Sequence, residues 1–155
     1  MKILDCTLRD GGFTQNFNWD FEFAKRYYNL MTKFNIPYIE LGYWMQTAKS
    51  SNPFYNFNFQ HLEKIAKDAN KKNVSIIIDY HYCTKDTSKY PKKFSTPVSL
   101  IRMTARKEDL KDALVFSENL KNDKDLDVSI QIINSTNYSK KELEEITSKL
   151  IKFNL

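Results

Sequence analysis

The sequence predicts an α/β fold in which a parallel sheet is covered by helices. Five short runs rich in β-branched and aromatic residues alternate with segments whose apolar residues recur every three or four positions. The strand-like runs are almost continuously apolar, as in strands buried on both faces. Each strand and its helix occupy about 30 residues, the length of a βαβ unit. From this pattern alone, an open doubly wound sheet and part of a barrel remain alternatives for a single domain over residues 1–155.

The first βα unit has the clearest local signals. A β-prone run at 2–7 is followed by Gly11-Gly12, a pair that is typical of turns and loops. Residues 19–34 then carry apolar side chains at the helical period, and Asp20 offers a carboxylate to the helix N-terminus. We therefore predict a strand followed by an amphipathic helix.

The next two strands are predicted at 38–44 and 74–80, with a helix at 59–70 between them. A connection rich in Ser, Asn and aromatic residues precedes that helix. Residues 81–97 have weak helical signals and are predicted to be mainly loop. The third unit is therefore expected to lack a full helix.

The last two units return to regular alternation. Strands are predicted at 98–104 and 128–133, and helices at 108–120 and 140–153. Ser139, followed by Glu142 three residues later, matches a capping box at the start of the last helix. No GxGxxG sequence follows any strand, which argues against a dinucleotide-binding fold.

Composition limits the function classes. With 41% hydrophobic residues the chain can bury a core. Its net charge is +5, but the lysines are scattered along the sequence, which favours a solvated surface over a nucleic-acid interface. No apolar run approaches the roughly 18 residues of a membrane span. Cys6 and Cys83 belong to no CxxC motif, so a reduced, cytoplasmic location is expected.

One motif carries candidate chemistry. Residues 5–12 read DCTLRDGG, so a buried strand leads into adjacent opposite charges, Arg9 and Asp10, and two glycines. In parallel α/β proteins the carboxyl ends of strands carry the active site. A carboxylate there can bind a hard divalent cation, and a guanidinium can stabilise an oxyanion. Glycines let the backbone turn sharply beside a ligand. A surface ion pair in a turn is the alternative.

This motif resembles the first-strand signature of the metal-dependent aldolases and lyases called DRE-TIM metallolyases. The resemblance implies a (β/α)₈ barrel, of which this chain would hold the first five βα units and end before the sixth strand. It implies that Asp10 is a ligand of the metal and that Arg9 stabilises the enolate. Glu40, in the sequence Ile-Glu-Leu-Gly and 40 − 9 = 31 residues after Arg9, would hold that arginine. Weaker agreement continues at 100–103 and 132–135.

The resemblance implies a divalent cofactor, Mg²⁺ or Mn²⁺, and a small 2-oxo acid or acyl substrate. The chain also departs from the family. A His-x-His pair that completes the metal site is absent, since the sequence has only His61 and His81. The catalytic histidine that hydroxy-oxovalerate aldolases carry just after the motif is replaced by Phe13. The metal site is therefore expected to be incomplete in this segment.

Other residues are candidates for binding substrate. Asp79 and His81 end the third strand two positions apart and, with Cys83, form an Asp-x-His-x-Cys string. A role in lining the pocket is favoured over a separate zinc site, because no fourth ligand lies at a useful spacing. Arg102 is unusual within a buried strand and indicates anion binding or ordering of the site. Asn134 and Ser135 end the fifth strand and could hydrogen-bond a substrate carboxylate.

Two functions from different classes follow. The chain is either the N-terminal part of an enzyme that cleaves or forms a carbon–carbon bond through a metal-bound enolate, or a catalytically inactive barrel fragment that serves assembly or binding. In both cases an open barrel side is expected to favour association, most simply as a homodimer. The predicted apolar residues of that inner side include Ile76, Ile78, Ile101 and Met103.

Overall fold

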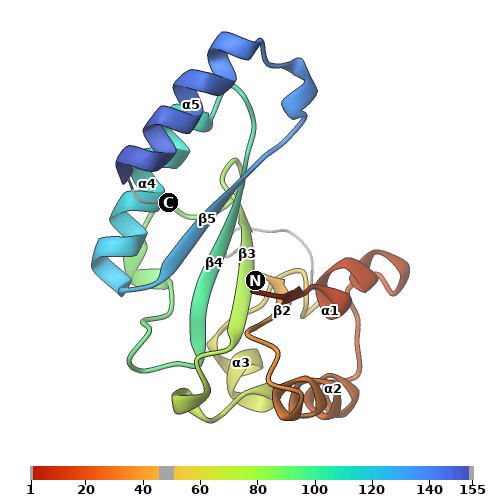
Figure 1. The fold of residues 1–155 in the computed structure, drawn as a ribbon. Helices are drawn as coiled ribbons and strands as arrows, with labels where there is room; N and C mark the ends of the chain where they lie inside the picture. Colours follow the sequence, from red (N-terminus) through yellow and green to blue (C-terminus); the bar gives the residue numbers. More distant parts are fainter. Residues whose placement is uncertain (1, 46–50, 154–155) are drawn as a thin grey trace.

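A computed structural model describes residues 2–45 and 51–153, which form a curled parallel sheet flanked by helices (Figure 1). The strands run in chain order: β1 (Leu4–Asp5), β2 (Tyr38–Tyr43), β3 (Val74–Asp79), β4 (Val98–Ala105) and β5 (Asp127–Ile132). All neighbouring pairs are parallel. Because the strand order never reverses, the sheet is part of a barrel, not a doubly wound sheet. The described residues form an incomplete barrel.

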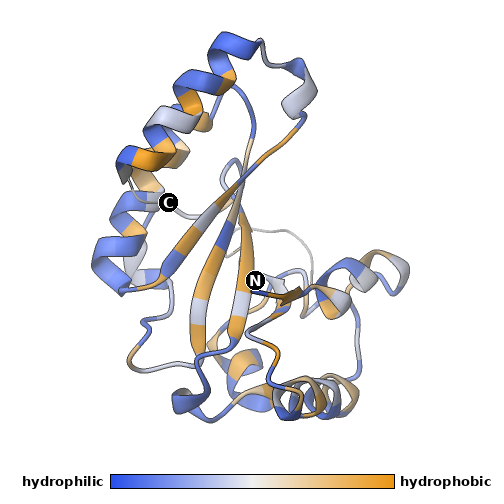
Figure 2. Ribbon diagram, viewed as in Figure 1, coloured by the Kyte–Doolittle hydropathy of each residue, from blue (hydrophilic) through white to orange (hydrophobic). Residues whose placement is uncertain are grey.

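In the described part of the chain, five α-helices accompany the strands: α1 (Thr7–Gly11), α2 (Phe21–Lys33), α3 (Phe59–Ile65), α4 (Leu110–Lys124) and α5 (Lys140–Phe153). α4 and α5 lie on the same side of β4 and β5 (Figure 1). Hydrophobic residues follow the strands, while the helices carry hydrophilic residues on their outer surfaces (Figure 2). Within the described ranges, no helix is long and apolar enough to cross a bilayer.

Capping explains where two helices begin, as the sequence predicts. The Asp20 carboxylate accepts a hydrogen bond from the Phe23 backbone N–H at 2.8 Å, at the start of α2. At α5 the Ser139 N–H donates to Glu142 Oε2 at 2.8 Å, and the Glu142 N–H donates to Ser139 Oγ at 3.3 Å. This reciprocal pair is a capping box, so the prediction from the sequence is confirmed.

The first strand is shorter than the predicted 2–7. It ends at Asp5, because the Asp5 carboxylate accepts the Thr7 N–H at 3.1 Å and so favours a turn over further strand pairing. The motif residues that follow form the short helix α1. Gly11 and Gly12 have ordinary helical φ angles of −62° and −54°, which corrects the expected sharp glycine turn. A Cβ on Gly12 would instead collide with the Phe17 ring.

The central helices also differ in extent from the predictions. α3 ends at Ile65, well before the predicted residue 70, and a 3₁₀ turn (Ala69–Lys71) follows it. There the Asp68 carboxylate accepts the Asn70 N–H at 2.9 Å, a local bond that competes with helix continuation. The connection between β3 and β4 is mainly loop, as predicted, with one 3₁₀ turn (Thr87–Lys89).

The convex face of the sheet, against the helices, is the apolar one. Met103 Sδ accepts a hydrogen bond from Ser117 Oγ of α4 at 3.4 Å, so Met103 faces that helix. Ile101 lies two residues earlier, and Ile76 and Ile78 are the register partners of Ile101 and Met103 on β3. All four side chains are fully buried in the core. The expectation that they line the open inner side is therefore wrong.

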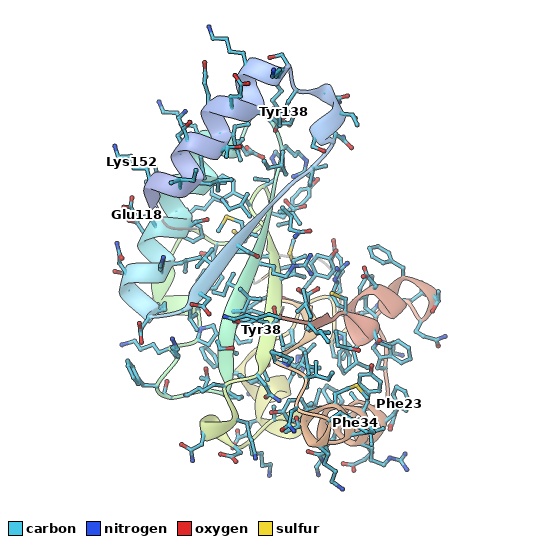
Figure 3. All side chains as sticks on the ribbon, viewed as in Figure 1. Phe23, Phe34, Tyr38, Glu118, Tyr138 and Lys152 are labelled. Carbon is cyan, nitrogen blue, oxygen red and sulfur yellow. The ribbon has the colours of Figure 1, made fainter. Side chains whose placement is uncertain are left out.

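The concave inner face carries charged and polar side chains beside apolar ones such as Ile77, which pairs with Arg102. Tyr38 of β2 donates from its hydroxyl to Asp127 Oδ2 of β5 at 3.2 Å, across the curled sheet. Figure 3 shows Tyr38 beside the strands on this open side. Glu40 and Arg102 belong to the same face. Association through the open side stays a prediction, but apolar burial by those four residues cannot drive it.

Candidate functional site

The centre of the candidate site is the carboxylate of Glu40, in the middle of β2. Its side chain is 0% exposed. Arg9 Nε donates to Glu40 Oε1 at 2.6 Å, and Arg102 Nη1 lies 2.9 Å from both carboxylate oxygens. One buried carboxylate thus binds two guanidinium groups. Burying a charge is costly unless it is paired and hydrogen-bonded, and here every partner is charged.

The curl of the sheet brings these residues together. Arg102 lies on β4 and Glu40 on β2, so one strand separates them. On β3, Ser75 is the register partner of Glu40 and is completely buried, whereas Arg102 pairs with Ile77, two residues further along the strand. Strands are about 4.8 Å apart, so the salt bridge spans roughly 10 Å between backbones. The long Arg102 side chain therefore extends across β3 to reach Glu40.

Arg9 and Asp10 reach the site from α1, directly after β1. Arg9 also forms an ion pair with Asp10, whose side chain is 59% exposed at the edge of the group. The Arg9 guanidinium lies 5.9 Å from the centre of the Tyr43 ring. Burial opposes the charge of Arg9, but the hydrogen bond and charge of Glu40 outweigh it, so the pKa of the guanidinium is raised. The structure brings Arg9, Asp10 and Glu40 together; their catalytic roles stay predictions.

The buried part of this group has more positive than negative charge. Glu40 supplies one carboxylate, whereas Arg9 and Arg102 supply two guanidinium groups whose side chains are only 11% and 10% exposed. Asp10 adds a second negative charge, but its side chain is exposed to solvent at the edge of the group. A partly desolvated positive excess favours a bound carboxylate or a developing oxyanion. The arrangement is therefore suited to stabilising negative charge on a small ligand.

Cys6 also belongs to this group. Arg102 Nη1 donates to Cys6 Sγ at 3.3 Å. The strand ends at Asp5, so Cys6 lies between β1 and α1 and is only half-buried. Burial and the nearby Glu40 charge raise the pKa of its thiol, against the opposing effect of the two arginines. The sequence signal that could have indicated this contact is the position of Cys6, three residues before Arg9 in the same motif.

Asp79 and His81 form a separate set of contacts. Asp79 accepts two hydrogen bonds from Arg106, at 2.9 and 3.2 Å, and His81 Nδ1 lies 3.0 Å from Asp109 Oδ2. Cys83 is buried and donates weakly to the Tyr80 carbonyl at 3.7 Å. The Asp-x-His-x-Cys string therefore does not converge on one point.

Asn134 and Ser135 are exposed beyond the end of β5. Asn134 has a left-handed backbone, with φ of 53° and ψ of 48°, and precedes a 3₁₀ turn (Ser135–Asn137). Asn134 borders an open pocket of about 310 Å³, whose other lining residues are Arg106, Lys107, Glu108, Ile133, Asn137 and Tyr138. That lining includes none of the Arg9, Glu40 and Arg102 group. The substrate-binding role of Asn134 and Ser135 stays a prediction.

The second histidine has no place in this site. His61 packs between Phe21 and Phe57, with ring centres 5.3 and 5.6 Å away. Burial lowers its pKa, and the nearby Lys64 charge adds to that effect. It is therefore a partly buried residue that packs against two aromatic rings.

The fit to a divalent metal is incomplete. Among residues 2–45 and 51–153, no three His, Cys, Asp or Glu side chains are grouped closely enough to hold a metal ion. Asp10 is exposed and could supply one oxygen ligand, but it is paired with Arg9. Mg²⁺ and Mn²⁺ require six oxygen or nitrogen ligands and bind weakly when water supplies most of them. The described residues do not form a complete metal site.

Weak metal binding is therefore the expected result for this chain. Calorimetric titration with Mn²⁺ should give a dissociation constant far above the micromolar range, because a single carboxylate cannot offset metal dehydration. Asp10→Asn should remove what binding there is, whereas Asp86→Asn, on the distant 3₁₀ turn, serves as the matched control. Sub-micromolar affinity of the unmodified chain would contradict this account of the site.

Comparisons with known proteins support the fold. No protein-family model matches the sequence, and no curated protein matches it. The structure is similar to the crystal structure of the N-terminal domain of a putative aldolase from Bacteroides vulgatus, with a TM-score of 0.71 and 20% sequence identity. The match covers 98% of this chain and 60% of that one. The chain thus has an aldolase-like fold and spans about three fifths of the solved chain's length.

Proposed function

We propose that this chain is the N-terminal part of an aldolase or lyase that cleaves or forms a carbon–carbon bond through an enolate. The observation that carries the proposal is the buried Glu40 carboxylate with Arg9 and Arg102 bound to it. The sequence motif and the aldolase-like fold support the same conclusion. The substrate would be a small 2-oxo acid or acyl compound, whose enolate is an oxyanion.

Arg9 is the residue that would meet the enolate oxygen. Its Nε donates to Glu40, while its Nη1 pairs with the exposed Asp10. A guanidinium fixed in this way loses little further freedom when negative charge develops beside it, which is the basis of electrostatic preorganisation. Glu40 would act on Arg9, and Arg102 would keep Glu40 in place. The carboxylate of a 2-oxo acid could share the same positive charge.

The proposal includes Mg²⁺ or Mn²⁺ at Asp10, where a divalent cation would add positive charge next to the enolate oxygen. The described residues supply one carboxylate for it, so further ligands would have to come from outside them. This assignment is an inference from the motif. The contacts of Arg9, Glu40 and Arg102 with one another support the roles that the motif implies for Arg9 and Glu40.

The proposed activity can be tested by incubating the protein with a 4-hydroxy-2-oxo acid and millimolar MnCl₂, then measuring pyruvate release with a coupled dehydrogenase. Release above the rate of the Arg9→Met variant is expected, since that variant lacks the guanidinium. Equal rates for the two proteins, or none with several chain lengths of substrate, would refute an aldolase of this substrate class.

A further inference from the structure

A row of apolar side chains on α2 is exposed to solvent. Phe23, Tyr27, Leu30 and Phe34 follow one another at steps of four, three and four residues, which places them along one side of the helix. Phe23 is 43% exposed, Leu30 48% and Phe34 67%. Figure 3 shows Phe23 and Phe34 on α2, far from α5. We call these four residues the α2 stripe.

Contacts with the rest of the protein hold the α2 stripe in place. Trp19 stacks on Phe23 with ring centres 5.5 Å apart, and Phe23 stacks on Tyr27 at 6.4 Å. The Tyr27 hydroxyl donates to Asp5 Oδ2 at 2.8 Å, and the Trp19 Nε1–H donates to the Leu8 carbonyl at 2.7 Å. Side chains that are fixed in this way lose little freedom when a partner binds. A contiguous row of exposed apolar side chains on a folded protein indicates an interaction site.

The spacing of the α2 stripe fits a second helix. Steps of four and three residues form the apolar seam between two helices that pack side by side. The stripe is only one row wide, because Ala24 and Tyr28 on its inner side are buried against the core. A bilayer takes up a broad apolar face, whereas a single row matches one amphipathic helix.

The outer side of the α2 stripe is basic. Arg26 and Lys33 each lie three residues after a member of the stripe, so both flank it. Both are exposed, and neither forms an ion pair with another residue in the described ranges. Glu22, the acidic residue of α2, pairs instead with Lys25 at 3.9 Å. The flank therefore carries two positive charges that a partner can neutralise.

We propose that the α2 stripe is the docking surface for an amphipathic helix of a partner protein, whose apolar seam is flanked by acidic residues. The seam would cover Phe23, Leu30 and Phe34, and the acidic flank would pair with Arg26 and Lys33. Complementary charge at the edge of an apolar contact selects the partner and fixes its register. A second copy fits less well. An antiparallel pair of α2 helices would set Arg26 of one copy beside Lys33 of the other, and like charges repel.

The test uses two synthetic peptides of about three heptads, both with leucine at the a and d positions. One peptide carries glutamate and the other lysine at the e and g positions, and fluorescence anisotropy measures their binding to the protein. The glutamate peptide should bind, and the lysine peptide should bind at least tenfold more weakly. Leu30→Glu should weaken binding of the glutamate peptide at least tenfold. Ile151→Glu, at a 74% exposed position on α5, is the matched control and should stay within twofold of the unmodified protein.

Charge reversal provides a variant that keeps every apolar side chain of the α2 stripe. The double variant Arg26→Glu and Lys33→Glu should prefer the lysine peptide over the glutamate peptide. Equal binding of the two peptides, binding of neither, or an unchanged preference in the double variant would overturn the proposal. A dimer that Leu30→Glu dissociates, as measured by light scattering, would overturn it in favour of a second copy. Cosedimentation with phosphatidylcholine–phosphatidylserine vesicles that Leu30→Glu abolishes would overturn it in favour of a bilayer.

Discussion

Glu40→Gln should lower the free energy of unfolding by about 3–5 kcal/mol, the cost of removing one partner from a buried ion pair. Glutamine has nearly the shape of glutamate, so the loss isolates the charge. Without the carboxylate, Arg9 and Arg102 would remain as two guanidinium groups, 11% and 10% exposed, with no buried anion between them. Urea denaturation followed by circular dichroism measures the change.

A matched control lies on α5. Glu144 pairs with Lys140 at 3.8 Å, and both side chains are largely exposed. Exposed pairs of this kind contribute little, so Glu144→Gln should change the free energy of unfolding by less than about 0.5 kcal/mol. If the Glu40 and Glu144 variants were equally stable, Glu40 would not hold two buried cations.

Arg9→Met should have the opposite balance of effects, with a small loss of stability and a large loss of activity. The substitution still leaves Glu40 paired with Arg102 at 2.9 Å, so no buried charge is abandoned. If Arg9 stabilises the enolate, its removal should lower kcat for pyruvate release about 10²- to 10³-fold, as loss of an oxyanion-stabilising donor does. Steady-state kinetics and urea denaturation of the same sample separate the two effects.

Arg9→Lys provides the graded comparison. Lysine keeps the positive charge but cannot reproduce the planar guanidinium that contacts Glu40 through Nε at 2.6 Å and also pairs with Asp10. We expect partial recovery of kcat relative to Arg9→Met. If Arg9→Met retained the full rate, the role assigned to Arg9 would be wrong, although the fold would be unaffected.

Much of the fold and the centre of the site could be predicted from the sequence because local signals and spacing agreed. The capping residues Asp20 and Ser139 mark helix starts through bonds to backbone groups a few residues away. The 31-residue interval between Arg9 and Glu40 matches one βα unit, which places both at neighbouring strands of a parallel sheet. Arg102 stood out because a buried strand seldom carries an unpaired charge.

The face of each strand was harder to predict. β3 is apolar at nearly every position, so its sequence lacks the alternation that separates the two faces. Ile76 and Ile78 were therefore predicted on the inner side, although they pack beneath the helices. The sequence of β4 does distinguish the two faces, because Arg102 marks the inner one. In the structure Arg102 is the register partner of Ile77, so Ile77 lies on the inner face and Ile76 and Ile78 lie on the outer face.

The contribution of Cys6 could not be predicted, because it depends on where β1 ends. A six-residue strand would have placed the thiol within a ladder, but the Asp5 carboxylate binds the Thr7 N–H and ends the strand early. The contact between Cys6 and Arg102 joins residues 96 positions apart, and only the curl of the sheet brings them together. Long-range contacts of this kind have no local signature in a sequence.

The most direct test of the account is oxalate binding, measured by calorimetry in millimolar MnCl₂ with the unmodified protein and with Arg9→Met. We expect the unmodified protein to bind oxalate and Arg9→Met to bind it at least tenfold more weakly, since the positive charge held by Glu40 is what attracts the enolate analogue. Equal affinity in the two proteins, or no binding by either, would contradict the claim that this buried group stabilises an enolate.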